Sequence, residues 1–146
     1  MAEVINEKEE VREKILEIFG SNDAVTLATT GGEFSPWILG AYFASRGLDM
    51  YLLLETHGKT MANLRISRNA AVAVSKNNAM EDFLQGTGTV EILDDSKEPE
   101  VRKMILEKMP WFQTFTPVTP VKISIRKFFV SSLQNQWFPA KVFETE

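Results

Sequence analysis

The sequence predicts a mainly β, α+β fold in which a barrel of short strands is flanked by helices. Six segments show the alternation or the short apolar runs of strands, and turns separate them about every ten residues. Two further segments have helical periodicity. Strands of this number and spacing close into a barrel, with helices filling its gaps. The 146 residues, 44% of them hydrophobic, suffice for one domain over 1–146 with a core.

The N-terminal half begins with a predicted helix over 6–19, where apolar residues recur at helical spacing among Glu and Lys. Asn6 is its candidate N-cap, with Glu9 three residues later as in a capping box. Strands are predicted over 24–30, 34–44 and 48–55, separated by turns at 31–32 and 45–47. Leu52–Leu54 is a continuous apolar run, so we expect the third strand to be buried on both faces.

The C-terminal half continues the same alternation. The predicted elements are a short helix over 59–68, strands over 70–76 and 82–93, a helix over 95–108, a strand over 121–133 and a tail over 137–144. Gly86 and Gly88 lie within a strand, which indicates a bulge or a close approach of another backbone. The aromatic, proline-rich loop at 111–120 is too apolar for an ordinary linker. Its aromatic residues favour packing, and the functional alternative is a lid over a bound ligand.

Composition excludes several classes of function. The net charge is −4 and the longest basic run is Arg126-Lys127, so a nucleic acid partner is not expected. The chain has no cysteine, which excludes disulfides, thiol chemistry and cysteine–metal sites. Its charged N-terminus does not have the pattern of a signal peptide, and no apolar run reaches the roughly 20 residues of a membrane span. We therefore expect a cytoplasmic protein without a membrane partner and without a metal site.

The most informative segment lies at residues 49–64. A predicted buried strand is followed by the turn Thr56-His57-Gly58 and by a helix that opens at Lys59-Thr60. The start of a helix carries unpaired backbone N–H groups and the positive end of the helix dipole. Together with the Lys59 ammonium and the Thr60 hydroxyl, these groups predict a site for an anion, most simply a phosphate. Because no nucleophile triad accompanies it, the phosphate is expected to be the handle of a bound cofactor.

Each of these residues also has an ordinary structural interpretation. A lysine in the first turn of a helix is usually only solvated, and His57, the one histidine, is more often a turn residue than a haem ligand. Gly58-Lys59-Thr60 is not the phosphate loop of nucleotide hydrolases, because the first glycine of that loop would have to stand at Leu53.

The ordered series of segments resembles a known family. Residues 23–30, Phe34-Ser35-Pro36, the strand 48–55, Lys59 with Asn63-Leu64, and residues 69–74 and 86–93 follow one another as in the flavin-binding split barrels. This is the pyridoxamine 5'-phosphate oxidase-like superfamily, and the resemblance covers about residues 10–95. It implies a six-stranded antiparallel split β-barrel with flanking helices. Residues 57–63 also resemble the corresponding turn of small bacterial FMN-binding proteins.

The resemblance further implies a homodimer with FMN at its interface. Lys59, Thr60 and Thr56 would meet the phosphate, residues 35–37 would lie along the isoalloxazine, and Gln85 and Trp137 would reach in from a partner subunit or the tail. The cofactor-binding residues expected in this way are Ser35, Pro36, Trp37, Leu53, Leu54, Thr56, His57, Lys59, Thr60, Asn63, Gln85 and Trp137.

The expected function is that of an FMN-dependent oxidoreductase, related to pyridoxamine 5'-phosphate oxidase, that acts on a small molecule or accepts hydride from a nicotinamide. The alternatives are a non-catalytic flavin or electron carrier, and a haem or deazaflavin (F420) binder on the same fold. Trp37-Ile38 stands where many oxidases of the family have an arginine, and Lys141 is isolated after Trp137. The first departure predicts a lower affinity for FMN, and the second argues against vitamin B6 chemistry as the native reaction. No residue suggests itself as an obligatory acid or base.

Overall fold

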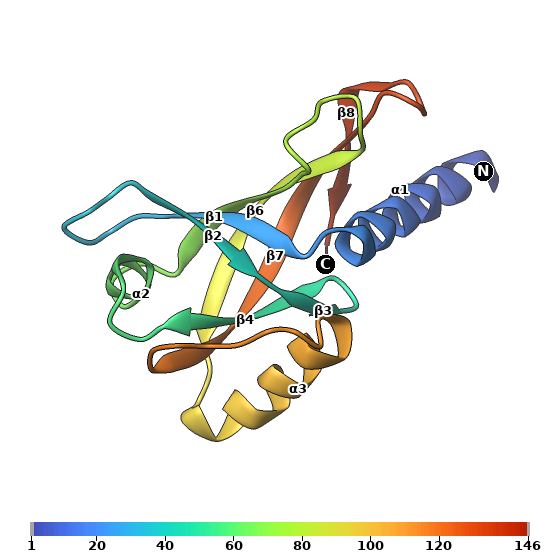
Figure 1. Ribbon diagram of the computed structural model, residues 1–146. Coiled ribbons are helices and arrows are strands. Elements are labelled where there is room, and N and C mark those ends of the chain that lie inside the picture. The colour runs from blue at the N-terminus through green and yellow to red at the C-terminus, as the bar shows by residue number, and fades with distance from the viewer. Residues whose placement is uncertain (1, 146) are drawn as a thin grey trace.

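The computed structural model describes residues 2–145, with side chains from residue 7 onward. Within this range the chain forms one curled, eight-stranded antiparallel sheet with helices packed against it (Figure 1). In chain order the elements are α1 (Ala2–Ser21), β1 (Ala24–Thr29), β2 (Trp37–Tyr42), β3 (Ala44–Arg46), β4 (Asp49–Glu55), α2 (Lys59–Leu64), β5 (Asn69–Val74), β6 (Phe83–Ile92), η1 (Asp95–Lys97), α3 (Glu98–Lys108), β7 (Val118–Ser132) and β8 (Trp137–Glu144).

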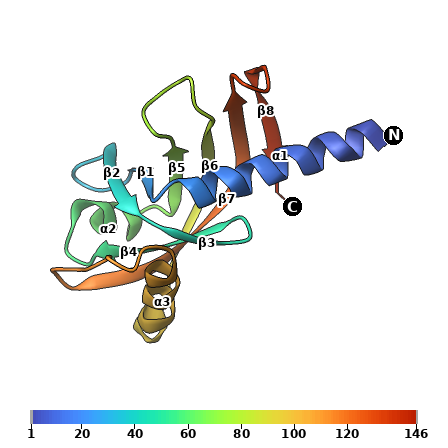
Figure 2. The same cartoon turned by 45° about the vertical axis from the view of Figure 1, so that its right-hand side comes forward.

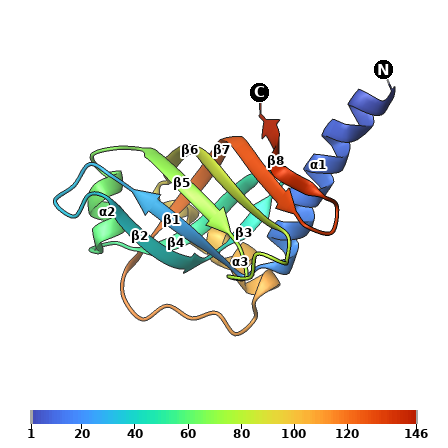
Figure 3. The same ribbon diagram turned by 90° about the horizontal axis from the view of Figure 1, so that it is seen from above.

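The sheet is curled because the continuous stretch of chain that contains β2 and β3 forms both of its edges. The strand order is β2-β1-β5-β6-β7-β4-β3, with β8 paired to β7. β2 leads almost directly into β3, so the same stretch pairs first with β1 and then with β4. Figures 2 and 3 show the resulting half-barrel, with α2 at one end and α1 and β8 at the other. The split β-barrel of the α+β class is thereby confirmed.

Several predicted boundaries are corrected by the structure. The expected tail over 137–144 is strand β8, which pairs with β7. The expected strand over 34–44 is divided into β2 and β3, so the barrel has eight strands rather than six. The helix expected over 59–68 ends at Leu64, and the cap expected at Asn6 is wrong because α1 already begins at Ala2.

The core lies on both faces of β4, as the apolar run at its centre predicts. Leu52 and Leu54 point into the barrel, where they join the large cluster that also includes Ile15 and Phe19 of α1. Leu53 points the opposite way and packs with Ile105 of α3 in a second cluster. All six side chains are at most 8% exposed. This two-sided burial stabilises β4 and thereby fixes the turn that follows it.

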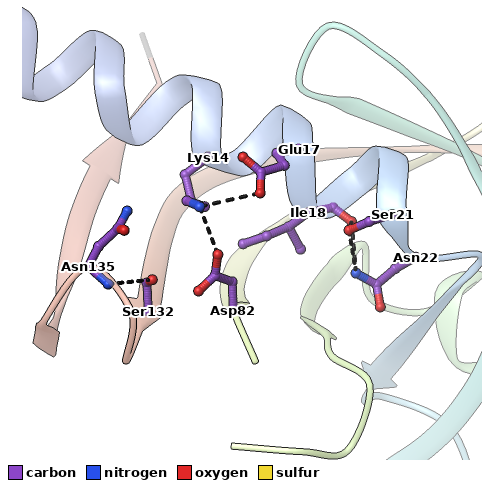
Figure 4. A network of polar contacts seen from close by, with 8 residues as sticks. All are labelled: Lys14, Glu17, Ile18, Ser21, Asn22, Asp82, Ser132 and Asn135. Carbon is purple, nitrogen blue, oxygen red and sulfur yellow. Dashed lines mark hydrogen bonds and ion pairs between the residues drawn. The ribbon is translucent and has the colours of Figure 1, made fainter. Parts of the chain in front are cut away.

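A network of polar contacts fastens α1 to the far end of the barrel (Figure 4). The Lys14 ammonium lies 2.7 Å from the Asp82 carboxylate, and both side chains are largely buried. Burial raises the pKa of Asp82, but hydrogen bonds from Lys14 and Ser132 and the charge of Lys14 outweigh it and hold that pKa below its ordinary value. Burial likewise lowers the pKa of Lys14, and the contacts to Asp82 raise it above its ordinary value. The charged pair is therefore the favoured state.

A second lysine ties α3 to the rest of the fold. The Lys108 ammonium donates to the carbonyl oxygens of Phe19 (3.0 Å), Asn22 (2.6 Å) and Phe43 (3.2 Å), and it lies 3.8 Å from the centre of the Phe43 ring. Burial lowers the pKa of Lys108, and the charge of Asp23 partly opposes this effect. Lys108 thus joins the ends of α1, β2 and α3.

Over the described residues, none of the helices combines the length and the apolar character that crossing a lipid bilayer would require.

Candidate functional site

The start of α2 presents backbone donors that no side chain of its own cap satisfies. Helix geometry leaves the first N–H groups without an intrahelical acceptor. Gly58 is the N-cap residue and has extended backbone angles, with φ −82° and ψ 171°. Without a side chain it forms no capping hydrogen bond, and α2 has no acidic residue in its first turn. The amides at this helix start are therefore available to an anion, as the sequence predicts.

The turn before α2 is held in place by the segment that leads into β7. The Thr56 N–H donates to the Pro117 carbonyl at 3.0 Å, and the hydroxyls of Thr56 and Thr119 lie 2.8 Å apart. The Arg65 guanidinium donates to the Thr56 carbonyl at 2.8 Å. Thr56 therefore fixes the position of the turn, and its hydroxyl already has a partner within the chain.

Lys59 lies over two aromatic rings beside the helix start. Its ammonium is 5.0 Å from the centre of the Phe34 ring and 5.3 Å from that of Trp37. The two rings meet edge to face, with centroids 6.0 Å apart. Phe34 comes from the loop between β1 and β2 and is 44% exposed, whereas Trp37 opens β2 and is half-buried. A cation and two aromatic surfaces thus meet at the mouth of the predicted anion site.

Asn63 fastens that loop to α2. Its side chain is fully buried. The Asn63 Oδ1 atom accepts from the Gly32 N–H at 2.8 Å, and Nδ2 donates to the Thr29 hydroxyl at 3.1 Å. A Cβ atom on Gly32 would lie only 2.2 Å from Asn63 Oδ1, so a glycine is needed at this approach. The amide of Asn63 therefore positions the site, and it is occupied by contacts within the chain.

Thr60 lies inside the fold, in contrast to its neighbour Lys59. It is 3% exposed, and its hydroxyl is buried without a hydrogen-bond partner in the part of the chain that the structure describes. Such an unsatisfied hydroxyl costs free energy. Contact with a ligand would need a rotation of the side chain. His57, in the preceding turn, is exposed.

The other residues expected to bind a cofactor are dispersed over the molecule. Leu54 lies in the main core and Leu53 under α3. Gln85 is exposed on the outer face of β6, and Trp137 is 7% exposed in the core at the start of β8. Figure 1 shows β8 at the end of the barrel opposite α2, so within one chain Trp137 does not approach Lys59. Contact of these four residues with a cofactor stays a prediction.

A wide cleft lies on the outer face of the sheet, next to the same loop. It has a volume of about 720 Å³ and runs across β1, β5, β6 and β7. Pro36, which follows Ser35 through a cis peptide bond, is one of its walls. Ser35 itself is exposed and donates its N–H to the Gly32 carbonyl at 3.2 Å. Among residues 7–145 no group of three or more metal-binding side chains is gathered, at the cleft or elsewhere.

Sequence reasoning missed the role of Phe34. The strand expected over 34–44 includes Phe34 as its first residue. The strand begins only at Trp37, which leaves Phe34 on the loop and free to meet Lys59. The signal that could have indicated a loop was Ser35-Pro36, since proline is confined to the margins of sheets.

Comparisons with known proteins identify the fold. No family model matches the sequence, and no curated protein matches it. Solved structures with a similar fold exist, and each of the three that follow has less than 25% sequence identity to this chain. A haem-binding protein from Mycobacterium smegmatis has a TM-score of 0.74 and 14% identity, and the match covers 91% of this chain and 57% of that protein. The chain therefore spans little more than half the length of this relative.

Two further structures match over nearly their whole length. A proposed pyridoxamine 5'-phosphate oxidase from Listeria innocua has a TM-score of 0.68 and 20% identity, with 82% of this chain and 97% of that one covered. HutZ, the haem storage protein from Vibrio cholerae, has a TM-score of 0.68 and 14% identity, with coverage of 84% and 96%. The fold is therefore the pyridoxamine 5'-phosphate oxidase-like split barrel, and at these identities it is the fold alone that is shown.

Proposed function

We propose that this protein binds FMN, with the phosphate at the start of α2 and the ring system beside Phe34 and Trp37. The observation that carries the proposal is the position of Lys59, which joins an uncapped helix start to two aromatic rings. A phosphate needs N–H donors and a cation, and a flavin ring needs flat apolar surfaces. The residues present at α2 offer both, and the split-barrel fold supports the same conclusion.

Lys59 changes partners in this proposal. A cation over an exposed aromatic ring is stabilised by about 0.5–1 kcal/mol, whereas a hydrogen bond to a charged group contributes about 1.5–3 kcal/mol. The ammonium is therefore expected to turn from the rings toward a phosphate, which frees the faces of Phe34 and Trp37. When bound, FMN supplies hydride and electron transfer, and the protein orients it and tunes its environment.

We further propose a homodimer formed through the outer face of β1 and β2. The side chains on this face are small, or apolar and exposed: Ile38 is 66% exposed and Tyr42 44% exposed. The Tyr42 ring lies edge to face with Trp111, 5.0 Å between centroids, which extends the apolar surface onto the loop after α3. Gln85 lies in the same row of the sheet through Ala73, which supports the expectation that it meets a partner subunit.

Fluorescence titration with FMN tests the binding site. Lys59→Ala is expected to weaken FMN binding by about 1–3 kcal/mol, the scale of one charge-assisted hydrogen bond. Lys103→Ala, which removes an exposed lysine from the middle of α3, is the matched control and is expected to leave affinity unchanged. Equal FMN affinity in the wild type and Lys59→Ala would refute the phosphate assignment. Light scattering of the purified protein, compared with Ile38→Glu, tests the dimer.

Haem is the second candidate, because the one histidine of the chain is exposed in the turn before α2. Two of the similar structures are of proteins described as haem-binding and haem-storing. If His57 were the iron ligand, the protein would show a Soret band on addition of hemin, and His57→Ala would remove or shift it. Retained flavin absorption with no Soret band would favour FMN.

An oxidoreductase and an electron carrier are distinguished by turnover. The FMN-loaded protein is mixed with NADH or NADPH, and the oxidation of the nicotinamide is followed with a small aromatic acceptor present. Catalytic oxidation supports the enzyme, whereas reduction of the flavin only by a chemical reductant supports the carrier. The deazaflavin F420 also carries phosphate, so it is tested as a competitor of FMN in the same titration.

A further inference from the structure

The segment that contains α2 is positively charged, although the chain as a whole is negative. The net charge is −4, yet residues 56–80 contain no aspartate or glutamate. The basic residues of this stretch are Lys59, Arg65, Arg68 and Lys76. Lys59 is the first residue of α2, and Arg65 is its C-cap residue. A local excess of one sign of charge attracts ligands of the opposite sign, so both ends of α2 are suited to an anion.

The side chain of Arg65 runs back along α2 to the turn that precedes the helix. Side chains of a helix lean toward its N-terminus. The Nη2 atom of Arg65 donates to the carbonyl oxygen of Thr56, nine residues earlier, at 2.8 Å. Ala62, three residues before Arg65, is exposed and has only a methyl group, so it does not obstruct this path. The guanidinium therefore lies beside the turn rather than at the helix end from which it comes.

The turn leaves the Thr56 carbonyl free for this contact. The Gly58 N–H donates to the Glu55 carbonyl at 3.1 Å, so Thr56 and His57 are the two central residues of the turn. The hydrogen bond that closes such a turn does not involve the carbonyls of its central residues. Because Thr56 is also held by the segment that leads into β7, the Arg65 guanidinium is attached to a fixed point.

The backbone of Arg65 is fixed as well. Its N–H donates to the Met61 carbonyl at 3.0 Å, and the next two N–H groups, of Ile66 and Ser67, both donate to the Asn63 carbonyl, at 3.0 and 2.9 Å. The long side chain is thus held at its base and at its tip. A group positioned in this way loses little conformational freedom when a ligand binds, which favours binding.

Most of the donors of Arg65 are free for a ligand. A guanidinium has five N–H donors, and the contact with Thr56 uses one of them. Among residues 7–145, no carboxylate lies within ion-pairing distance of Arg65 or of Lys59. The planar donor group of an arginine matches the oxygens of a phosphate. Two cations without a carboxylate partner therefore lie at the turn before α2.

We propose that Arg65 is the second cation of the phosphate site. One of its N–H groups holds the Thr56 carbonyl, and the others pair with the phosphate that Lys59 binds. Two positive charges suit a phosphate monoester, which carries close to two negative charges at neutral pH. The inference rests on the FMN binding proposed above and deepens it. Trp37-Ile38 in place of an arginine predicts a lower affinity for FMN, and Arg65 supplies a guanidinium from another element.

Fluorescence titrations with FMN and riboflavin, which differ only by the phosphate, test the assignment. Arg65→Gln is expected to weaken FMN binding about tenfold or more, the effect of losing one charge-assisted hydrogen bond, with a far smaller effect on riboflavin. Arg65→Lys is expected to retain part of the affinity, because it keeps the charge but not the planar donors. Ala62→Glu places a carboxylate three residues before Arg65, where it competes for the guanidinium, and is expected to weaken FMN as well.

The dependence of FMN affinity on salt gives a second measurement, which a purely structural role of Arg65 would not change. Salt screens the attraction between a cation and a phosphate. The affinity of the wild type is therefore expected to fall more steeply with added sodium chloride than that of Arg65→Gln. Arg12→Gln removes an arginine from α1, at the other end of the barrel, and is the matched control. It is expected to change neither the FMN affinity nor its salt dependence.

The assignment is overturned if Arg65→Gln binds FMN as tightly as the wild type, if it weakens FMN and riboflavin by the same factor, or if its salt dependence equals that of the wild type. Lys59→Ala separates this result from the function proposed above. If Lys59→Ala binds FMN normally and Arg65→Gln does not, the role of Lys59 is refuted and that of Arg65 is supported. A wild type that binds no FMN overturns both.

Discussion

The contact between α2 and the loop before β2 can be tested by substitution of one buried amide. Asn63→Ala removes an acceptor from the Gly32 N–H and a donor from the Thr29 hydroxyl, at 2.8 and 3.1 Å. A buried polar group left without its partner costs about 1–3 kcal/mol. Gly32 is only half-buried, so a water molecule can replace the Asn63 oxygen as the acceptor of its N–H. The loss of this hydrogen bond is therefore expected to cost only about 1 kcal/mol. With the volume lost at a fully buried position, we expect a loss of about 2–5 kcal/mol in the free energy of unfolding.

The assay is urea unfolding followed by far-ultraviolet circular dichroism, with the wild type and the variant compared at equal protein concentration. The denaturant slope is expected to stay the same, so that the shift in midpoint reports stability. Thr29→Val deletes one of the two hydrogen bonds and is expected to cost about 1–3 kcal/mol. In a double-mutant cycle the two losses are expected to fall short of additivity by about 0.5–3 kcal/mol.

A loss below about 1 kcal/mol for Asn63→Ala would show that neither hydrogen bond contributes measurably to stability, which would contradict the anchoring role of this residue. Strict additivity of the two substitutions would show that the side chains do not interact. If Asn63 anchors the loop before β2, the folded Asn63→Ala variant should also bind FMN less tightly, because Phe34 is carried by that loop.

Three further perturbations test the sheet and the two buried lysines. Gly88→Ala is expected to destabilise the protein by about 1–3 kcal/mol in urea unfolding, because its methyl group would meet a carbonyl oxygen 2.0 Å away, whereas Gly40→Ala, with no atom within 4 Å, should be neutral or stabilising. Asp82→Asn is expected to lose about 1–3 kcal/mol at neutral pH, because it leaves Lys14 without a charged partner. Since the folded pKa of Asp82 is depressed, its contribution is present above the ordinary pKa of 3.8 and is lost as the pH falls through the folded value, so wild type and variant should converge in acid. Lys108→Met is expected to lower the thermal midpoint, because three carbonyl oxygens lose their donor, and an unchanged midpoint would contradict that role.

Much of the barrel could be predicted from local patterns, because those patterns record which side of each strand is buried. The alternation of Val25, Leu27 and Thr29 predicts one buried face of β1, and all three are at most 1% exposed. The apolar run at Leu52–Leu54 predicts burial on both faces, which α3 and the barrel interior provide. Gly88 within a strand predicts a bulge or a close approach, and both occur there.

The errors arise where pairing partners are distant in the sequence. Residues 137–144 contain a proline, which argues against a strand, but β8 pairs only with β7 and therefore tolerates Pro139 at an edge. The division of the strand at Phe43 follows from a change of partner, from β1 to β4. No local signal marks such a change, because it depends on how the whole sheet curls.

The candidate site also combines features that local sequence patterns predict with features that depend on contacts between distant residues. Turn residues and apolar runs are local signals, so they suffice to predict a helix that opens at Lys59 after a buried strand. The order of the segments likewise indicates the split barrel. Three features could not be read from the sequence: the internal hydrogen bonds of the Asn63 side chain, the position of Phe34 and Trp37 beside the Lys59 ammonium, and the bulge at Arg126. These facts depend on contacts between residues far apart in the chain, and such contacts exist only once the sheet has closed.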